Sequence, residues 1–281
     1  MKKLLVAAGT LIAGVAGLIF FGTARWRTGT ATLVGQLRRE GTTAPPAVFT
    51  PGDLDQLPVP VARYFRAVLP ESGQVIRYAR LTQRGRFLTR PTPDGWRPFQ
   101  AIEHFTATPP GFVWDARIRM LPGLTVMVRD GFVGGRGMMV GTAMGLRRLL
   151  AVEGTPAISA GALQRYLAEA VWLPTALLPS QGVAWAPLSD SSARATLSAG
   201  ATTVSVDFHF GADGLVGRIF TAARERDLGG GRSEPTPWQG RFSRYEQRAG
   251  FRIPLAGEVE WVLPEGPQPY WRGEIIQATY E

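Results

Sequence analysis

Apolar and polar residues alternate with a period of two along most of the chain beyond residue 75. The clearest runs are 112–120, 203–210 and 258–263. Because neighbouring side chains of a strand point to opposite faces, these runs predict strands with one buried face and one solvent-exposed face. Short connections rich in Gly and Pro separate the strands, and they predict an antiparallel meander. Weaker runs of the same kind are 75–89, 99–108, 125–133, 194–197, 216–222, 240–247 and 270–280.

In two segments the apolar residues recur with helical spacing instead. In 59–69, apolar residues recur every three or four positions, and Pro70 follows. The second segment is 164–178, with Ser159 as the expected N-cap. A single long helix between two sets of strands is expected to pack on a curved sheet. The pattern therefore predicts an α+β fold, mostly antiparallel β, in which a large curved sheet or half-barrel wraps around one central helix.

The N-terminus follows a third pattern. After two lysines, an uninterrupted apolar and small-residue run extends from Leu4 to Ala24. About 20 such residues cross a hydrocarbon core of about 30 Å, so the run predicts an N-terminal transmembrane helix with Trp26 at headgroup level. A cleaved signal peptide is the alternative, although its apolar core is usually shorter, about 7–15 residues. The chain is therefore divided into an anchor or signal segment (1–27), a polar stalk (28–57) and a β-rich domain (58–281).

The orientation of this segment rests on two opposing arguments. Basic residues flank it on both sides, and counting them alone would keep the domain in the cytoplasm. Long domains, however, translocate largely regardless of charge, and export signals begin with a short basic N-terminus. We expect a single-pass membrane protein whose domain lies outside the cytoplasm.

Composition excludes several classes of chemistry. The net charge is +9, but the arginines are scattered along the sequence without a dense basic patch, so no nucleic-acid partner is expected. The absence of Cys excludes disulfides and thiolate catalysis. His104 and His209 lack neighbours with metal-ligand spacing, and no metal or other cofactor is expected. The chain has neither a Gly-x-Ser-x-Gly elbow nor a phosphate-binding loop, which favours a protein that is not an enzyme.

The best candidate site lies on the second helix. Tyr166, Glu169 and Trp172 are three residues apart and can share one side of it. If that side faces the sheet, Glu169 is a buried acid that needs a partner such as Arg117 or Arg119; otherwise it lies on the polar flank of the helix. Large aromatic residues on the strands either fill the core or line an apolar pocket. The predicted ligand-binding residues are Tyr166, Glu169, Trp172, Trp114, Arg117 and Trp261.

Three segments resemble a bacterial family of uncharacterised proteins that carry an N-terminal hydrophobic segment. They are Arg165–Pro179, Pro109–Ala116 and Thr236–Trp238. The resemblance covers most of 57–281 and implies no particular activity. The order of strands, one helix and then strands is also similar to the LolA/LolB-type lipoprotein carriers. That resemblance implies an open sheet that wraps around a helix and holds acyl chains.

These observations lead to one main hypothesis and two alternatives. The main hypothesis is a membrane-anchored module that binds a lipid or acyl chain in a cavity between the curved sheet and the helix. The first alternative is a scaffold protein of the cell envelope whose sheet edge pairs with a partner strand. The second is a hydrolase that uses Glu169 or the pair Glu258 and Glu260, because two nearby carboxylates can act on a glycosidic bond.

Overall fold

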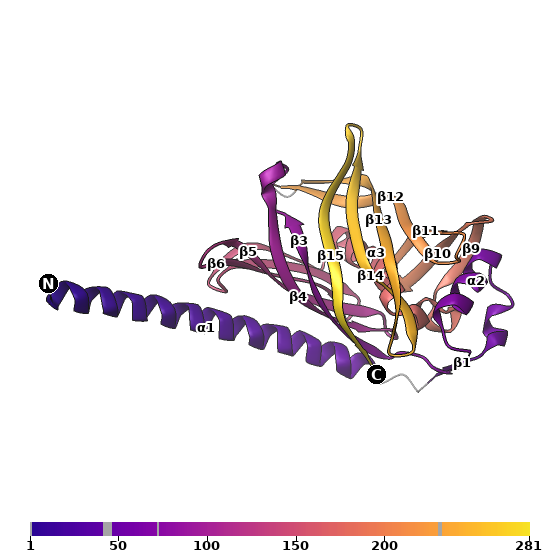
Figure 1. Cartoon of the computed structure of the whole chain (residues 1–281), viewed down its shortest axis with the longest axis horizontal. Coiled ribbons are helices and arrows are strands. Elements are labelled where there is room, and N and C mark those ends of the chain that lie inside the picture. The colour runs from indigo at the N-terminus through magenta and orange to yellow at the C-terminus, as the bar shows by residue number, and fades with distance from the viewer. Residues whose placement is uncertain (1, 42–46, 72, 230–231) are drawn as a thin grey trace.

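Most of the chain forms one open, curved sheet of 13 antiparallel strands (Figure 1). The computed structural model describes residues 2–41, 47–71, 73–229 and 232–281, without the side chains of residues 2–9, 11, 12 and 15. A separate two-stranded sheet pairs β1 (Val48–Phe49) with β2 (Gly73–Gln74). The strands of the large sheet are β3 (Tyr78–Leu88), β4 (Trp96–Thr106), β5 (Gly111–Leu121), β6 (Leu124–Val133), β7 (Arg136–Ala143), β8 (Arg147–Glu153), β9 (Ala184–Ser189), β10 (Ser192–Ala199), β11 (Thr202–Phe210), β12 (Val216–Gly229), β13 (Arg232–Arg248), β14 (Phe251–Leu263) and β15 (Gly266–Tyr280).

The strand order explains why one helix lies inside the sheet. Strands β3 to β8 form one meander that runs from the centre of the sheet to one edge, and β9 to β15 form a second that runs from the other edge back to the centre. The two meanders join where β3 pairs with β15. Helix α3 (Pro156–Glu169) lies between the two edge strands in sequence and contacts strands of both meanders. The predicted antiparallel half-barrel around a central helix is confirmed.

Local sequence sets the two ends of α3. The Thr155 side chain accepts a hydrogen bond from the backbone N–H of Ile158, and Pro156 occupies the first turn, where proline is tolerated. Thr155 is therefore the N-cap, and the prediction of Ser159 was wrong. Ser159 is buried within the helix instead, where its Oγ accepts a hydrogen bond from the backbone N–H of Gly137. Beyond Glu169 the chain continues as the short 3-10 turns η3 (Ala170–Trp172), η4 (Pro174–Leu177) and η5 (Pro179–Gln181).

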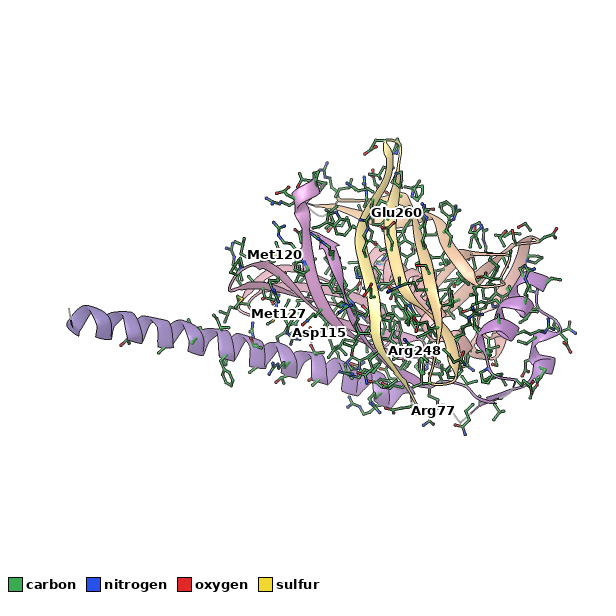
Figure 2. All side chains as sticks on the ribbon, viewed as in Figure 1. Arg77, Asp115, Met120, Met127, Arg248 and Glu260 are labelled. Carbon is green, nitrogen blue, oxygen red and sulfur yellow. The ribbon has the colours of Figure 1, made fainter. Side chains whose placement is uncertain are left out.

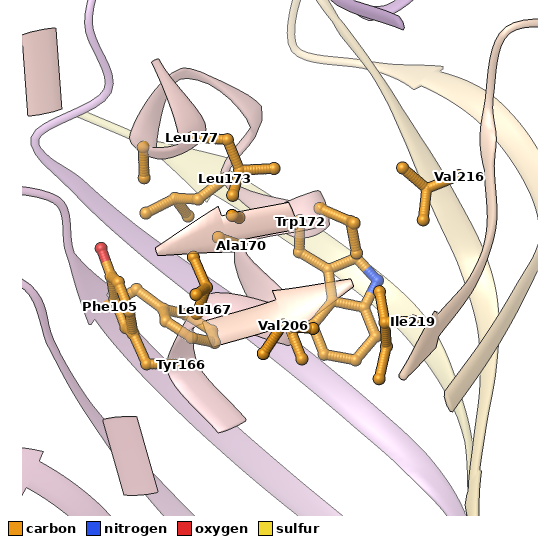
Figure 3. Packing of buried hydrophobic residues seen from close by; sticks show 14 of the residues in the cluster. Phe105, Tyr166, Leu167, Ala170, Trp172, Leu173, Leu177, Val206, Val216 and Ile219 are labelled. Carbon is orange, nitrogen blue, oxygen red and sulfur yellow. The ribbon is translucent and has the colours of Figure 1, made fainter. Parts of the chain in front are cut away.

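Apolar residues of α3 and these turns fill the inside of the sheet. Figure 3 shows Tyr166, Leu167 and Trp172 among aliphatic and aromatic residues of the strands. All three are buried, with at most 1% of their surface exposed. Helix α2 (Val59–Val68), predicted from its spacing, is also present, and its Val61, Tyr64 and Phe65 belong to the same core. The two helices and the concave face of the sheet therefore share one hydrophobic core.

Three strands of the large sheet were not predicted, nor were the short strands β1 and β2. Strands β7 and β8 carry glycines at 137 and 141 and consecutive leucines at 149 and 150, which hide any alternation. Strand β9 has five of its six residues exposed and lies at an edge of the sheet, so it lacks a buried apolar face. A period of two appears in sequence only where one face of a strand is buried.

Helix α1 (Lys2–Gly41) is a single helix of 40 residues, and its C-terminal half lies against the outer face of β4 to β6. Residues 28–41, predicted as a polar stalk, are helical because Leu37 packs against Val113 and Val133 of the sheet. Trp26, predicted at headgroup level, is buried against the sheet, where its indole Nε1–H donates to Asp115 Oδ1 over 2.9 Å. Asp115 is labelled on the sheet in Figure 2. Residues 42–46 of the predicted stalk lie outside the described residues.

The predicted transmembrane helix is not found in the described part of the chain. No helix whose side chains are described there is both long enough and apolar enough to cross a membrane. The side chains of residues 4–9, 11, 12 and 15, which belong to the predicted run, lie outside the described residues. The division of the chain at residues 27 and 57 stays a prediction.

Candidate functional site

A cluster of charged side chains lies between α3 and the concave face of the sheet, with Arg165 of α3 at its centre. The guanidinium donates to Glu103 on β4 over 2.9 Å and to Asp130 on β6 over 2.7 Å. Its Nε donates to both carboxylate oxygens of Glu169, one turn further along α3, over 3.0 Å. Glu103 has no exposed surface, and only 12% of the Arg165 side chain is exposed. We call Arg165, Glu103, Asp130 and Glu169 the Arg165 cluster.

Neutral groups continue this hydrogen-bond network into the sheet. The second carboxylate oxygen of Glu103 accepts a hydrogen bond from Gln83 Nε2 over 2.6 Å. The Gln83 amide oxygen in turn accepts one from the indole N–H of Trp114 over 2.9 Å. The Arg165 guanidinium also lies 5.0 Å from the ring centroid of Trp114, close enough for a cation–π interaction. The network therefore connects α3 to four neighbouring strands, β3, β4, β5 and β6.

Three carboxylates surround one arginine, and burial raises the pKa of two of them. Burial, together with the neighbouring Glu169 carboxylate, raises the pKa of Glu103 well above its ordinary value. Burial also raises the pKa of Glu169, although the Arg165 guanidinium and a hydrogen bond with Glu103 oppose that rise. Burial therefore favours the protonated form of both glutamates, and the Arg165 guanidinium opposes that effect.

The structure brings four of the six predicted site residues into the interior. Glu169 is bound by Arg165 of its own helix, so the prediction of Arg117 or Arg119 as its partner was wrong. Both of those arginines point to the outer face of β5, because Trp114, Ala116 and Ile118 occupy the inward positions of that strand. Trp261 lies near the end of β14, away from the cluster.

The interior residues are held by internal contacts. The hydroxyl of Tyr166 donates to the Thr106 carbonyl over 2.9 Å, and the indole N–H of Trp172 donates to the Pro254 carbonyl over 3.0 Å. Trp172 also packs edge-on against Phe242, with ring centroids 5.7 Å apart. Tyr166, Trp172 and Trp114 thus fill the core at the place where the sequence suggested a ligand cavity.

A hollow of about 400 Å³ opens instead at the ends of three hairpins, β3–β4, β12–β13 and β14–β15, which lie near the top of Figure 1. We call it the mouth hollow. Trp261 and Tyr270 stack in its wall, with ring centroids 5.8 Å apart. Three leucines add apolar surface and two arginines lie at its rim; these are Leu88, Leu228, Leu263, Arg90 and Arg226.

One further arginine supports the aromatic wall of this hollow. The guanidinium of Arg224 lies 4.5 Å from the ring centroid of Trp238 and 5.8 Å from that of Trp261. It donates to the Tyr270 hydroxyl over 3.2 Å and to the Gly161 carbonyl of α3 over 3.2 Å. Arg224 therefore connects the wall of the mouth hollow directly to the central helix.

Ion pairs account for the carboxylates proposed for a hydrolase. Glu258 is paired with Arg241 and Arg272, and the buried Glu260 accepts hydrogen bonds from Gln239 and Arg241. Within the described residues, no three His, Cys, Asp or Glu side chains group as metal ligands.

The two histidines lie on strands as expected. His104 is close to the Tyr78 hydroxyl, and burial, with Arg80 nearby, lowers the pKa of His104 to about 4. Burial, aided by Arg218, also lowers the pKa of His209.

Sequence reasoning missed Arg165, Glu103 and Asp130, although each left a signal. Arg165 stands four residues before Glu169, the spacing of an ion pair along one helix side. Glu103 shares the inward positions of β4 with Phe99, Ala101 and Phe105, and Asp130 shares those of β6 with Phe132. An acid on an apolar face of a strand indicates a buried charge with a partner. Arg224 had no comparable signal, because a bulge in β12 interrupts the alternation before it.

Comparison with known proteins places the domain in a family. The family model described as "Family of unknown function (DUF6920)" matches residues 55–280. The chain belongs to DUF6920. No curated protein matches this DUF6920 chain. The matched residues cover the large sheet and its central helix, so the expected resemblance to a family of unknown function is confirmed.

Two solved structures resemble this DUF6920 chain at low sequence identity. One is the crystal structure of a LolA superfamily protein from Nitrosomonas europaea, with 9% identity and a TM-score of 0.40, covering 79% of this chain and 92% of that one. The other is a β-barrel-like protein of the domain of unknown function DUF1849 from Brucella abortus, with 8% identity and a TM-score of 0.26, covering 73% and 99%. A LolA superfamily protein is thus among the chains that resemble this one, as the sequence predicted.

Proposed function

We propose that this chain is a membrane-attached domain that binds the apolar part of an amphiphilic ligand, such as an acyl chain, in the mouth hollow. The volume of about 400 Å³ supports the proposal, because small-molecule sites usually enclose about 300–1,000 Å³. Stacked Trp261 and Tyr270 with neighbouring leucines offer an apolar wall. Arg90 and Arg226 are paired with Asp94 and Glu234, and Asp227 and Glu265 also line the hollow, so its apolar wall carries the proposal rather than its charge.

The mouth hollow is a better candidate than the space around α3. A ligand between α3 and the sheet would have to displace Tyr166 and Trp172 and break the Arg165 cluster. A ligand in the mouth hollow displaces no side chain of the core. Of the residues predicted to bind ligand, Trp261 alone lines this hollow.

Replacing Trp261 by alanine should weaken binding of a fluorescent long-chain fatty acid by about tenfold, because it removes apolar contact area worth more than about 1.4 kcal/mol. Titration of the full-length chain in non-ionic detergent would measure the Kd. Trp185→Ala is the matched control, because Trp185 is also half-buried and packs on Phe208, outside the residues that line the hollow. An equal loss in both variants, or no loss in Trp261→Ala, would contradict the proposed site.

Membrane attachment through the N-terminus remains part of this proposal. The run from Leu4 to Ala24 motivates it, and Phe20 and Phe21 are 75% and 63% exposed. In Figure 1 the first half of α1 projects beyond the domain. Gly22 contacts the β7–β8 turn at Leu146. About 20 residues precede that contact, and at about 1.5 Å per residue they would extend about 30 Å, roughly one hydrocarbon core.

Apolar residues at two hairpin ends support the same arrangement. Leu121 at the end of β5 is 60% exposed, Leu146 is 41% exposed, and Met120 marks this end of the sheet in Figure 2. The β5–β6 and β7–β8 ends adjoin each other, because the backbone N–H of Met144 donates to the Thr125 carbonyl. With α1 inserted, both ends would face the membrane surface.

Single cysteines can test this placement, because the chain has no Cys of its own. In full-length protein on phospholipid vesicles, an environment-sensitive dye at Leu121→Cys or Leu146→Cys should shift to the blue, whereas the same dye at Ala201→Cys on a distant turn should not. Failure of the chain to associate with vesicles would contradict attachment. Association without a shift would contradict the placement alone. Labelling of Ala201→Cys in intact host cells by an impermeant thiol reagent would test the proposed extracytoplasmic side.

A further inference from the structure

A second and larger hollow lies on the outer face of the sheet, with a volume of about 1020 Å³. It spans the middle strands and is separate from the mouth hollow. Two glutamates, Glu258 and Glu274, contribute to its lining. Six arginines from β3, β5, β13 and β15 also line it, and we call it the arginine groove; they are Arg84, Arg86, Arg117, Arg119, Arg241 and Arg272.

The strand register places arginines directly opposite one another in this groove. Arg86 of β3 pairs with Arg272 of β15, and Arg241 of β13 pairs with Arg218 of β12. Like charges at directly opposed positions destabilise an antiparallel pair of strands. Glu258 is the carboxylate between them, and it pairs with both Arg272 and Arg241. Glu260 also accepts a hydrogen bond from Arg241, and Glu274 pairs with Arg84. Three glutamates thus face the six arginines of the groove, which leaves an excess of positive charge across neighbouring strands.

Two arginines of the groove have no acidic partner in the described chain. Arg117 lies opposite the neutral Gln100 of β4, and Arg119 lies opposite the neutral Thr125 of β6. Neither makes an ion pair or a side-chain hydrogen bond with another described residue. Both project from the outer face of β5, so their guanidinium groups remain free to bind a ligand.

We propose that the arginine groove binds a ligand carrying adjacent phosphate groups. Guanidinium groups bind phosphate oxygens bidentately, and a phosphate has enough acceptors to engage more than one arginine. Six arginines against three glutamates favour a ligand with several negative charges, because such a ligand relieves the repulsion between the opposed pairs. This inference does not rest on the acyl-chain proposal, since the groove lies on the opposite face of the sheet.

Calorimetric titration of the full-length chain with inorganic tripolyphosphate tests the proposal. We expect saturable binding that weakens with added salt and falls at least tenfold in the double variant Arg117→Gln/Arg119→Gln. These two arginines have no partner whose charge would be left uncompensated, so the variant should keep its melting temperature. The matched control is Arg63→Gln/Arg66→Gln on α2, which removes the same charge elsewhere.

Two phosphate sources, lipid headgroups and free oligophosphates, give different results in this titration. A soluble short-chain phosphatidylinositol 4,5-bisphosphate, which carries two adjacent phosphates, that binds more tightly than the matching phosphatidylcholine, with loss in the Arg117/Arg119 variant, would assign the groove to lipid headgroups. Binding of tripolyphosphate without that preference would assign it to a free oligophosphate. Absence of binding to either probe, or an equal loss in both double variants, overturns the proposal. Tighter binding of a single-stranded oligonucleotide than of tripolyphosphate also overturns it in favour of nucleic acid.

Discussion

Replacing Arg165 by methionine should lower the free energy of unfolding by about 3–5 kcal/mol, because it leaves buried carboxylates without their cation. Arg165 donates to Glu103, Asp130 and Glu169, and among the described residues none of the three has another arginine as a hydrogen-bond partner. Methionine keeps the length and apolar volume of the side chain, so packing changes little. Denaturant unfolding at neutral pH would measure the loss.

The control for this substitution is a surface ion pair. Arg194→Met removes the partner of Asp207, but the Arg194 side chain is 49% exposed and water can solvate the remaining carboxylate. Its cost should stay below about 1 kcal/mol. If the two variants lose similar stability, the Arg165 cluster is not the electrostatic centre of the interior. A second comparison at lower pH sharpens the test: protonation of the stranded glutamates should restore part of the stability of the Arg165 variant.

The sequence predicted most strands and the curved sheet around one helix because alternation and turn residues act locally. Runs such as 203–210 have one buried face, and that face is visible as a period of two. The pairing of β3 with β15, which joins the two meanders, had no such signal. It brings together residues about 200 positions apart, such as Ala79 and Tyr280. This pairing depends on how both meanders curve around α3.

The candidate sites were harder to predict because each depends on pairing between strands. The arginine groove shows this most clearly. Its arginines are scattered along the sequence, which suggested the absence of a basic patch, yet the register places Arg86 beside Arg272. The Arg165 cluster is similar, because Glu103 and Asp130 lie on strands that meet only through β5. The sequence left two orientations open for the helix side that carries Tyr166 and Glu169; the structure turns that side towards the sheet, and the space there is filled.

Replacing Trp172 by alanine tests whether that interior is a solid core or a site that a ligand can enter. The indole is 1% exposed and lies against Phe242 and Trp271. A Cβ on Gly257 would lie 3.5 Å from the ring, at ordinary van der Waals distance, so the ring packs closely on β14. Truncation removes these contacts and leaves a cavity, and we expect a loss of about 3–5 kcal/mol in the free energy of unfolding.

The same variant distinguishes the two locations for an apolar ligand. If the interior is core, Trp172→Ala should lose stability while its mouth hollow keeps its affinity for the fatty acid, corrected for the folded fraction. Trp261→Ala should instead lose affinity for the fatty acid and keep its stability, since Trp261 is only partly buried. A Trp172 variant that unfolds like the unchanged chain but no longer binds the fatty acid would place the ligand beside α3. That result would restore the cavity between helix and sheet and refute the mouth hollow.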